Sequence, residues 1–222
     1  MGVAAIIPAA GSGNRFGEEK QFKLLKGRPL LHYAIDPFTK LSFIKEIIVV
    51  VSVDKVRSVS TNLISSFGKG LITVVSGGLR RQDSVEEGVK AAGKSIKTIC
   101  IHDAARPFIT ESLIKATIDQ CKIADGAIVA IQPVDTVKKS LYGEIKSTIN
   151  RENIWLAQTP QTFNKKKLLI AYEYAKENRL EVTDESQLME EAGFLVLPVL
   201  GRSSNFKVTS RADWARAEGL VK

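Results

Sequence analysis

The sequence predicts the α/β fold class, with an open, mostly parallel sheet and helices on both of its faces. Short runs rich in β-branched residues recur along the chain, and most are continuously apolar, which is typical of strands buried on both faces. Segments with helical spacing separate these runs, so strands and helices alternate. The 222 residues, 44% hydrophobic and 25% charged, suffice for one large domain around a buried core.

The elements can be assigned in chain order. Strands are expected at 3–7, 46–53, 71–76, 98–103, 126–134 and 194–200. Helices are expected at 30–41, 54–67, 83–94, 111–124, 165–178 and 185–192.

The order breaks between residues 134 and 155. This segment is too polar for burial on two faces and predicts two short strands around Tyr142-Gly143-Glu144. A projecting β-arm and an ordinary surface hairpin both fit it. We therefore expect a Rossmann-like sheet in a single domain spanning 1–222, with a β-arm at about 134–155.

Charge and composition exclude several classes of protein. The 32 Lys and Arg against 24 Asp and Glu give a net charge of +8, which favours an acidic partner such as nucleic acid, an anionic membrane or a phosphate-rich substrate. The basic residues are dispersed and form no nucleic-acid-binding pattern. No apolar run reaches the roughly 18 residues of a membrane span, and the apolar start lacks the basic region of a signal peptide. Cys100 and Cys121 have no metal or redox spacing, so a reducing cytoplasm is expected.

A glycine-rich segment, PAAGSGNRFG, follows the first predicted strand. Gly11 and Gly13 would let backbone N–H groups approach a phosphate there. The dinucleotide fingerprint needs glycine where Phe16 stands, and the GK[ST] ending of a P-loop is missing. Arg15 and Lys20 follow closely and would bring two cations to a triphosphate, although either alone fits a solvated surface residue.

The segment GGLRRQDSVEEG leads from a strand into a helix. Asp83 or Ser84 near the first helical turn fits an ordinary helix cap. The functional alternative is that the backbone at Gly78 and Leu79, with the Ser84 hydroxyl, contacts a base edge while Arg81 handles charge.

The segment HDAARPF places a carboxylate and a guanidinium at the end of a buried strand. Asp103 is a hard oxygen ligand that suits Mg²⁺, which takes one or two carboxylates and completes its shell with phosphate and water. A structural ion pair between Asp103 and Arg106 is the alternative. His102 and His32 are expected to serve packing rather than catalysis.

Together the motifs resemble one family, the 2-C-methyl-D-erythritol 4-phosphate cytidylyltransferases of the non-mevalonate isoprenoid pathway. The motifs in order are AAGSGNRFG, KQF, GGLRRQDSV, HDAARP, DTVK, AQTPQTF, VTDE and NFKVT, and the resemblance runs from about Val3 to Val221. The related ribitol-5-phosphate cytidylyltransferases share much of this set but usually show AGGxGxR at the first turn. Two departures stand out: Glu19 replaces a proline before Lys20 in a shorter loop, which leaves the reach of Lys20 open, and Leu79 replaces an acidic residue.

The resemblance implies a Mg²⁺-dependent enzyme that transfers cytidylyl from CTP to methylerythritol phosphate. It implies catalytic roles for Arg15, Lys20 and Lys207 and a metal role for Asp103. Nucleotide-binding positions are Ala9, Ala10, Gly11, Gly13, Gly78, Leu79, Ser84, Asp103 and Ala104. Positions for the acceptor substrate are Arg106, Thr136, Arg151, Thr159, Thr183 and Asp184.

The expected partners are CTP and a polyol phosphate, with neither nucleic acid nor membrane. In the family the arm reaches into the other subunit, so the resemblance also implies a homodimer with exchanged arms. A ribitol-5-phosphate cytidylyltransferase and, from a different class, a basic nucleotide- or RNA-binding module are the alternatives.

Overall fold

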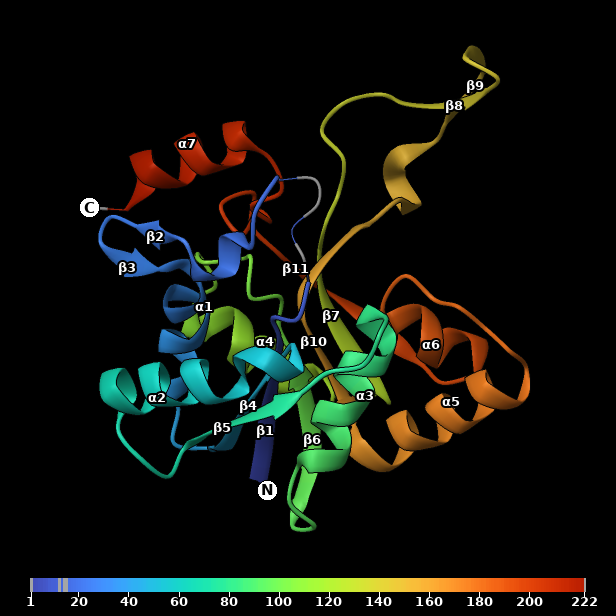
Figure 1. The fold of residues 1–222 in the computed structure, drawn as a ribbon. Helices are drawn as coiled ribbons and strands as arrows, with labels where there is room; N and C mark the ends of the chain where they lie inside the picture. Colours follow the sequence, from blue (N-terminus) through green and yellow to red (C-terminus); the bar gives the residue numbers. More distant parts are fainter. Residues whose placement is uncertain (1, 12, 14–15, 222) are drawn as a thin grey trace.

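The structure, a computed structural model, describes residues 2–11, 13 and 16–221. Its centre is a seven-stranded sheet in the order β11-β7-β10-β6-β1-β4-β5 (Figure 1). Its strands are β1 (Gly2–Pro8), β4 (Ile44–Val51), β5 (Ile72–Ser76), β6 (Ile96–Ile101), β7 (Gly126–Ile131), β10 (Leu156–Asn164) and β11 (Val196–Leu200). Among the described strands of this seven-stranded sheet, β10 alone runs antiparallel to its neighbours. The predicted open, mostly parallel sheet is therefore confirmed.

Helices cover both faces of the sheet, as predicted (Figure 1). One face carries α1 (Leu30–Thr39), α2 (Val56–Phe67) and α4 (Glu111–Gln120), and the other carries α3 (Arg81–Ala91), α5 (Lys165–Glu177) and α6 (Glu185–Glu191). Side chains of a strand point alternately to the two faces. In β1, Ala5 and Ile7 therefore join one core while Ala4 and Ile6 join the other. Burial of each isoleucine contributes about 1.5–3 kcal/mol, which explains why the strand is continuously apolar.

A smaller third core joins the beginning of the chain to its end. Helix α7 (Arg211–Leu220) packs near the short strands β2 (Leu24–Leu25) and β3 (Arg28–Pro29) (Figure 1). Its Trp214 lies 5.6 Å, between ring centroids, from Phe16. Both rings are buried, so the last helix of the chain is anchored on the loop that follows β1.

The segment expected to form a β-arm is a hairpin of β8 (Val137–Leu141) and β9 (Glu144–Ile149). Tyr142 and Gly143 form its turn with φ of 51° and 83°, a left-handed conformation in which glycine carries no steric cost. The hairpin projects away from the sheet and its helices (Figure 1), which distinguishes it from a hairpin lying on the surface. The arm predicted from the polar pattern is confirmed.

Among the longer elements of the described residues, β10 and α7 were not predicted. Strand β10 lies in the middle of the sheet, yet its sequence LAQTPQTFN has no continuous apolar run, because its buried residues include Gln158, Thr159, Gln161 and Thr162. Helix α7 was missed because its apolar face is narrow, and only Trp214 and Ala217 of this helix are buried. Helix α4 ends at Gln120 rather than at residue 124. No helix in the described part of the chain is long and apolar enough to cross a bilayer.

Candidate active site

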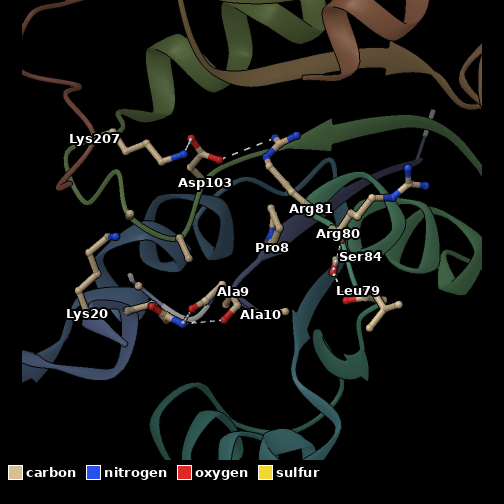
Figure 2. Close-up of a pocket in the computed structure, with 16 residues that line it drawn as sticks. Pro8, Ala9, Ala10, Lys20, Leu79, Arg80, Arg81, Ser84, Asp103 and Lys207 are labelled. Atoms are coloured by element: carbon tan, nitrogen blue, oxygen red, sulfur yellow. Dashed lines mark hydrogen bonds and ion pairs between the residues drawn. The ribbon is translucent and has the colours of Figure 1, made fainter. Parts of the chain in front are cut away.

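A cavity of about 470 Å³ opens at the carboxyl ends of β1, β5 and β6 (Figure 2). After β1 the chain forms β4 on one side of β1 and later forms β6 on the other side, so the strand order reverses at β1. Ligands of open α/β sheets bind at such a switch point. The lining residues are Pro8, Ala9, Ala10, Gly11, Gly13, Lys20, Gln21, Gly78, Leu79, Arg80, Arg81, Ser84, Asp103, Ala104, Ala105 and Lys207. The cavity thus brings together all predicted nucleotide-binding positions and both predicted catalytic lysines, Lys20 and Lys207.

The glycine-rich loop forms one wall of the cavity. Gly13 has φ of 71°, and a Cβ added there would lie 1.9 Å from the carbonyl oxygen of Glu18, so a side chain is excluded. The buried side chain of Gln21 donates hydrogen bonds of 2.8 Å to the carbonyl oxygens of Ala9 and Gly11. These contacts turn both carbonyls toward Gln21 and fix the backbone beside the cavity. Lys20 lines the cavity, so the shorter loop still carries it there.

The predicted catalytic residue Arg15 lies outside the described residues. The structure therefore places Lys20 and Lys207 but says nothing of this third cation.

The beginning of α3 forms a second wall. A Cβ on Gly78 would lie 2.5 Å from the Cβ of Asp83, so the turn needs glycine for its close approach to the helix. Asp83 accepts a hydrogen bond from the backbone N–H of Arg80 and caps the helix, as its position in the sequence suggested. The hydroxyl of Ser84 donates to the carbonyl oxygens of Arg80 and Gly78, at 3.0 and 3.3 Å.

Asp103 is the centre of charge in the cavity. Its Oδ2 lies 2.9 Å from Nζ of Lys207, and its Oδ1 lies 3.8 Å from Nη2 of Arg81 (Figure 2). Oδ2 also lies 3.4 Å from Nε of Arg106. Burial alone would raise the pKa of Asp103, but these three positive charges hold the pKa well below its usual range. The carboxylate is therefore ionised at neutral pH.

A buried network fixes the backbone of Asp103 from behind. The N–H of Asp103 donates to Oγ1 of Thr159 at 3.0 Å, and Oγ1 is also 3.0 Å from Nδ1 of His102. The other ring nitrogen, Nε2, is 3.0 Å from the carbonyl oxygen of Arg106. Burial lowers the pKa of His102 to about 4, so the ring is neutral and one tautomer satisfies both contacts. His102 has the packing role that was predicted for it.

Arg106 and Asn205 connect this network to the loop that carries Lys207. Nη1 of Arg106 donates to the carbonyl oxygen of Asn205 at 2.8 Å, and the Asn205 side chain donates to the carbonyl oxygen of Thr159 at 2.8 Å. Because Asn205 is fully buried, it fixes the position from which Lys207 reaches Asp103.

The predicted acceptor-binding residues lie outside the cavity lining. Arg106 and Thr159 are buried behind Asp103, and the Asp103–Arg106 ion pair that the sequence left as an alternative is present. Asp184 caps α6 and accepts from Nε2 of Gln161 at 2.8 Å, while Thr183 next to it is exposed. Two further positions, Thr136 and Arg151, are exposed on the segment that includes the arm.

Some cavity residues were not among the predicted site positions. They are Pro8, Gln21, Arg80, Arg81 and Ala105. Arg81 had been named for handling charge, and Gln21 stands in the KQF motif, so the motifs did contain both signals. What the motifs did not reveal is that the Gln21 side chain holds the backbone of the loop.

Fold and cavity together define an α/β protein with a cation-lined cavity at the switch point of its sheet. The family model for 2-C-methyl-D-erythritol 4-phosphate cytidylyltransferase matches residues 3–222. The enzymes of that name from Geotalea uraniireducens and Bacillus licheniformis are 37% and 38% identical to this chain, covering 100% of it and 97% and 96% of their own lengths. The chain belongs to this family.

Solved structures agree with the assignment. The 4-diphosphocytidyl-2C-methyl-D-erythritol synthase from Anaerococcus prevotii superimposes with a TM-score of 0.87 at 32% identity, over 98% of this chain and 97% of its own. The cytidylyltransferase from Thermus thermophilus gives a TM-score of 0.82 at 29% identity, over 99% and 98% of the two chains.

Proposed function

We propose that this protein transfers cytidylyl from CTP to 2-C-methyl-D-erythritol 4-phosphate. An oxygen of the acceptor phosphate attacks the α-phosphorus of CTP, and the bond from that phosphorus to the bridging oxygen of the β-phosphate breaks. The products are 4-diphosphocytidyl-2-C-methyl-D-erythritol and pyrophosphate. The observation that carries this proposal, beside family membership, is an ionised carboxylate between Lys207 and Arg81 in a cavity walled by a glycine-rich loop.

The reaction needs charge neutralisation more than proton transfer. The acceptor phosphate is already an anion, so no general base is required. His102, the histidine nearest to Asp103 in sequence, is buried and neutral and serves the backbone instead. What the enzyme must do is hold two polyanions in line although they repel each other.

The cavity cations meet this need. Lys20 and, by family resemblance, Arg15 would hold the triphosphate and stabilise the charge that develops on it. Lys207 would lie near the attacking phosphate. Cytosine would be read at the start of α3, by the backbone at Gly78 and the hydroxyl of Ser84.

Asp103 fits a divalent cation such as Mg²⁺. No group of three or more His, Cys, Asp or Glu suited to a metal occurs in the described part of the chain, so the protein itself would supply this single carboxylate. One carboxylate is enough where phosphates and water complete the shell. Oδ1 is the oxygen that fits, because Oδ2 already pairs with Lys207. Bound there, Mg²⁺ would neutralise charge on the triphosphate.

A second subunit would complete the binding site for the acceptor substrate. Thr136 and Arg151 flank the two strands of the projecting hairpin in the sequence, and the family resemblance places both on the acceptor. The hairpin exposes Leu141, Tyr142 and Ile145, which a partner subunit would cover. We therefore propose a homodimer with exchanged arms. Arg106, Thr159, Thr183 and Asp184 would support the acceptor from the cavity's own subunit.

Pyrophosphate release tests the proposal. CTP, Mg²⁺ and methylerythritol phosphate should give pyrophosphate, whereas ribitol 5-phosphate should give little and a binding module would give none. UTP should be a poor donor, because a carbonyl that accepts from the amino group of cytosine would face the uracil carbonyl instead. Faster release with ribitol 5-phosphate would reassign the acceptor, and equal turnover of UTP would refute the reading of the base at Gly78.

A further inference from the structure

Arg81 lies between two carboxylates, one in the cavity and one behind it. It is the first residue of α3 and lines the cavity, with Nη2 facing Oδ1 of Asp103 at 3.8 Å. On its other side, Nη1 donates to both carboxylate oxygens of Glu185, at 3.0 and 2.9 Å. Glu185 is the first residue of α6 and is fully buried. Helices that begin 104 positions apart thus share one guanidinium.

The two contacts are unequal. The distances to Glu185 are those of charge-assisted hydrogen bonds, while 3.8 Å to Asp103 is too long for a hydrogen bond. Burial raises the pKa of Glu185 and the charge of Arg81 opposes that rise. A carboxylate buried this completely persists because the guanidinium pairs with it, so its presence keeps Arg81 from closer contact with Asp103.

This distance matters for Asp103. Its Oδ2 already pairs with Lys207 and Arg106, so Oδ1 is the oxygen left for a divalent cation. If Arg81 lost its partner, its nearest carboxylate would be Asp103, and the guanidinium would move onto Oδ1. A positive charge in that place would repel the cation and occupy its ligand.

We propose that Glu185 is a positioning residue, which keeps the guanidinium of Arg81 off Asp103 so that this carboxylate can bind the divalent cation that accompanies CTP. The inference rests on the metal role of Asp103 in the proposed function. It assigns to Glu185 an effect on the metal dependence of CTP binding.

Calorimetric binding of CTP to the intact protein, once with Mg²⁺ and once with EDTA, tests the proposal without any acceptor or turnover. Glu185→Gln keeps the size of the side chain and removes its charge. The gain in CTP affinity that Mg²⁺ gives should fall about tenfold, in the range found for residues that support metal ligands. Glu185→Asp keeps the charge on a shorter side chain and should restore part of this gain.

Glu86→Gln is the matched control. Glu86 is also buried, lies on α3, and pairs with Lys90 and Lys176 at 3.0 and 2.7 Å, away from the cavity. The same chemical change there should lower the melting temperature without altering the effect of Mg²⁺ on CTP binding. An equal loss of the Mg²⁺ effect in both variants would overturn the proposal, because it would reflect general destabilisation.

The route through Arg81 can be tested separately. In an Arg81→Met background there is no guanidinium to move, so Glu185→Gln should no longer change the Mg²⁺ effect. A persistent change would show that Glu185 acts by another route and would overturn the proposal. A wild-type protein that binds CTP equally in Mg²⁺ and EDTA would also overturn it, while the pyrophosphate assay would still decide the proposed transfer.

Discussion

Predicted site residues line the cavity and flank the hairpin of β8 and β9, and these are opposite physical settings. Around Asp103, ion pairs and buried hydrogen bonds converge from β6, β10, α3 and the loop before α7. The hairpin stands away from the body, and its contacts within the chain are mainly those between its own strands (Figure 1). The half of the site that would bind the nucleotide is thus prearranged by the fold of one chain. In the proposed homodimer the arm would dock on the other subunit, which would make that subunit part of the acceptor site.

The largest effect is expected in the prearranged half. Lys207→Ala should lower kcat about a hundredfold or more, as does removal of a group that stabilises charge in a transition state. Lys20→Ala should lower kcat to a similar extent, because Lys20 would stabilise the charge that develops on the triphosphate. Steady-state kinetics with both substrates gives the result, with Lys115→Ala on α4, outside the cavity, as the control. A variant that keeps most of its turnover would remove that lysine from the catalytic group.

A smaller effect is expected from the arm. Arg151→Ala should raise KM for methylerythritol phosphate at least tenfold, because a hydrogen bond to a charged group contributes about 1.5–3 kcal/mol. KM for CTP should hardly change. If both KM values rose together, the division of the two halves between cavity and arm would be wrong.

Mixed dimers test whether the arm serves the other subunit. Arg151→Ala chains refolded with Lys20→Ala chains should recover about a quarter of wild-type activity, since half of the dimers are mixed and one of their two sites is intact. If Arg151 served its own subunit, every site would lack one residue. Activity no greater than that of the separate variants would then reject the exchanged arm.

The smallest expected effect is a difference in the free energy of unfolding between substitutions in the buried network and beside the arm. Thr159→Val removes the buried acceptor of the Asp103 N–H and should lower the free energy of unfolding by about 1–3 kcal/mol. Thr136→Val is the same change at an exposed position and should alter it by less than about 0.5 kcal/mol. Urea unfolding measures both. Equal losses would mean that the surroundings of Thr136 are as ordered as the core.

The sequence predicted those parts of the fold whose signal is local. The apolar run of β1 is continuous because both faces of that strand are buried, and Tyr142-Gly143 predicts a turn by its backbone preferences. Strand β10 gives no such signal. Its polar residues are satisfied by distant partners, such as Gln158 with Asn205 and Thr162 with Thr117. These partners come together only in the folded protein, so the local sequence does not reveal that β10 is a buried strand.

The site shows the same limit. The positions that line the cavity follow glycine turns and strand ends, which short motifs contain, so the sequence could predict that these positions lie together. The buried positions of Arg106 and Thr159 could not, because they depend on Asn205, about a hundred residues beyond Arg106. Glu185 was overlooked for the same reason, although it stands in the VTDE motif.

The contact between Phe16 and Trp214 affects the order in which parts of the fold can be completed during synthesis. The loop after β1 is synthesised long before the helix on which its aromatic ring packs. Lys207, the partner of Asp103, also arrives late. A nascent chain that has completed six strands of its sheet therefore still lacks both the support of its first loop and one of its cations. The cavity is therefore complete only after all strands of the sheet have been synthesised.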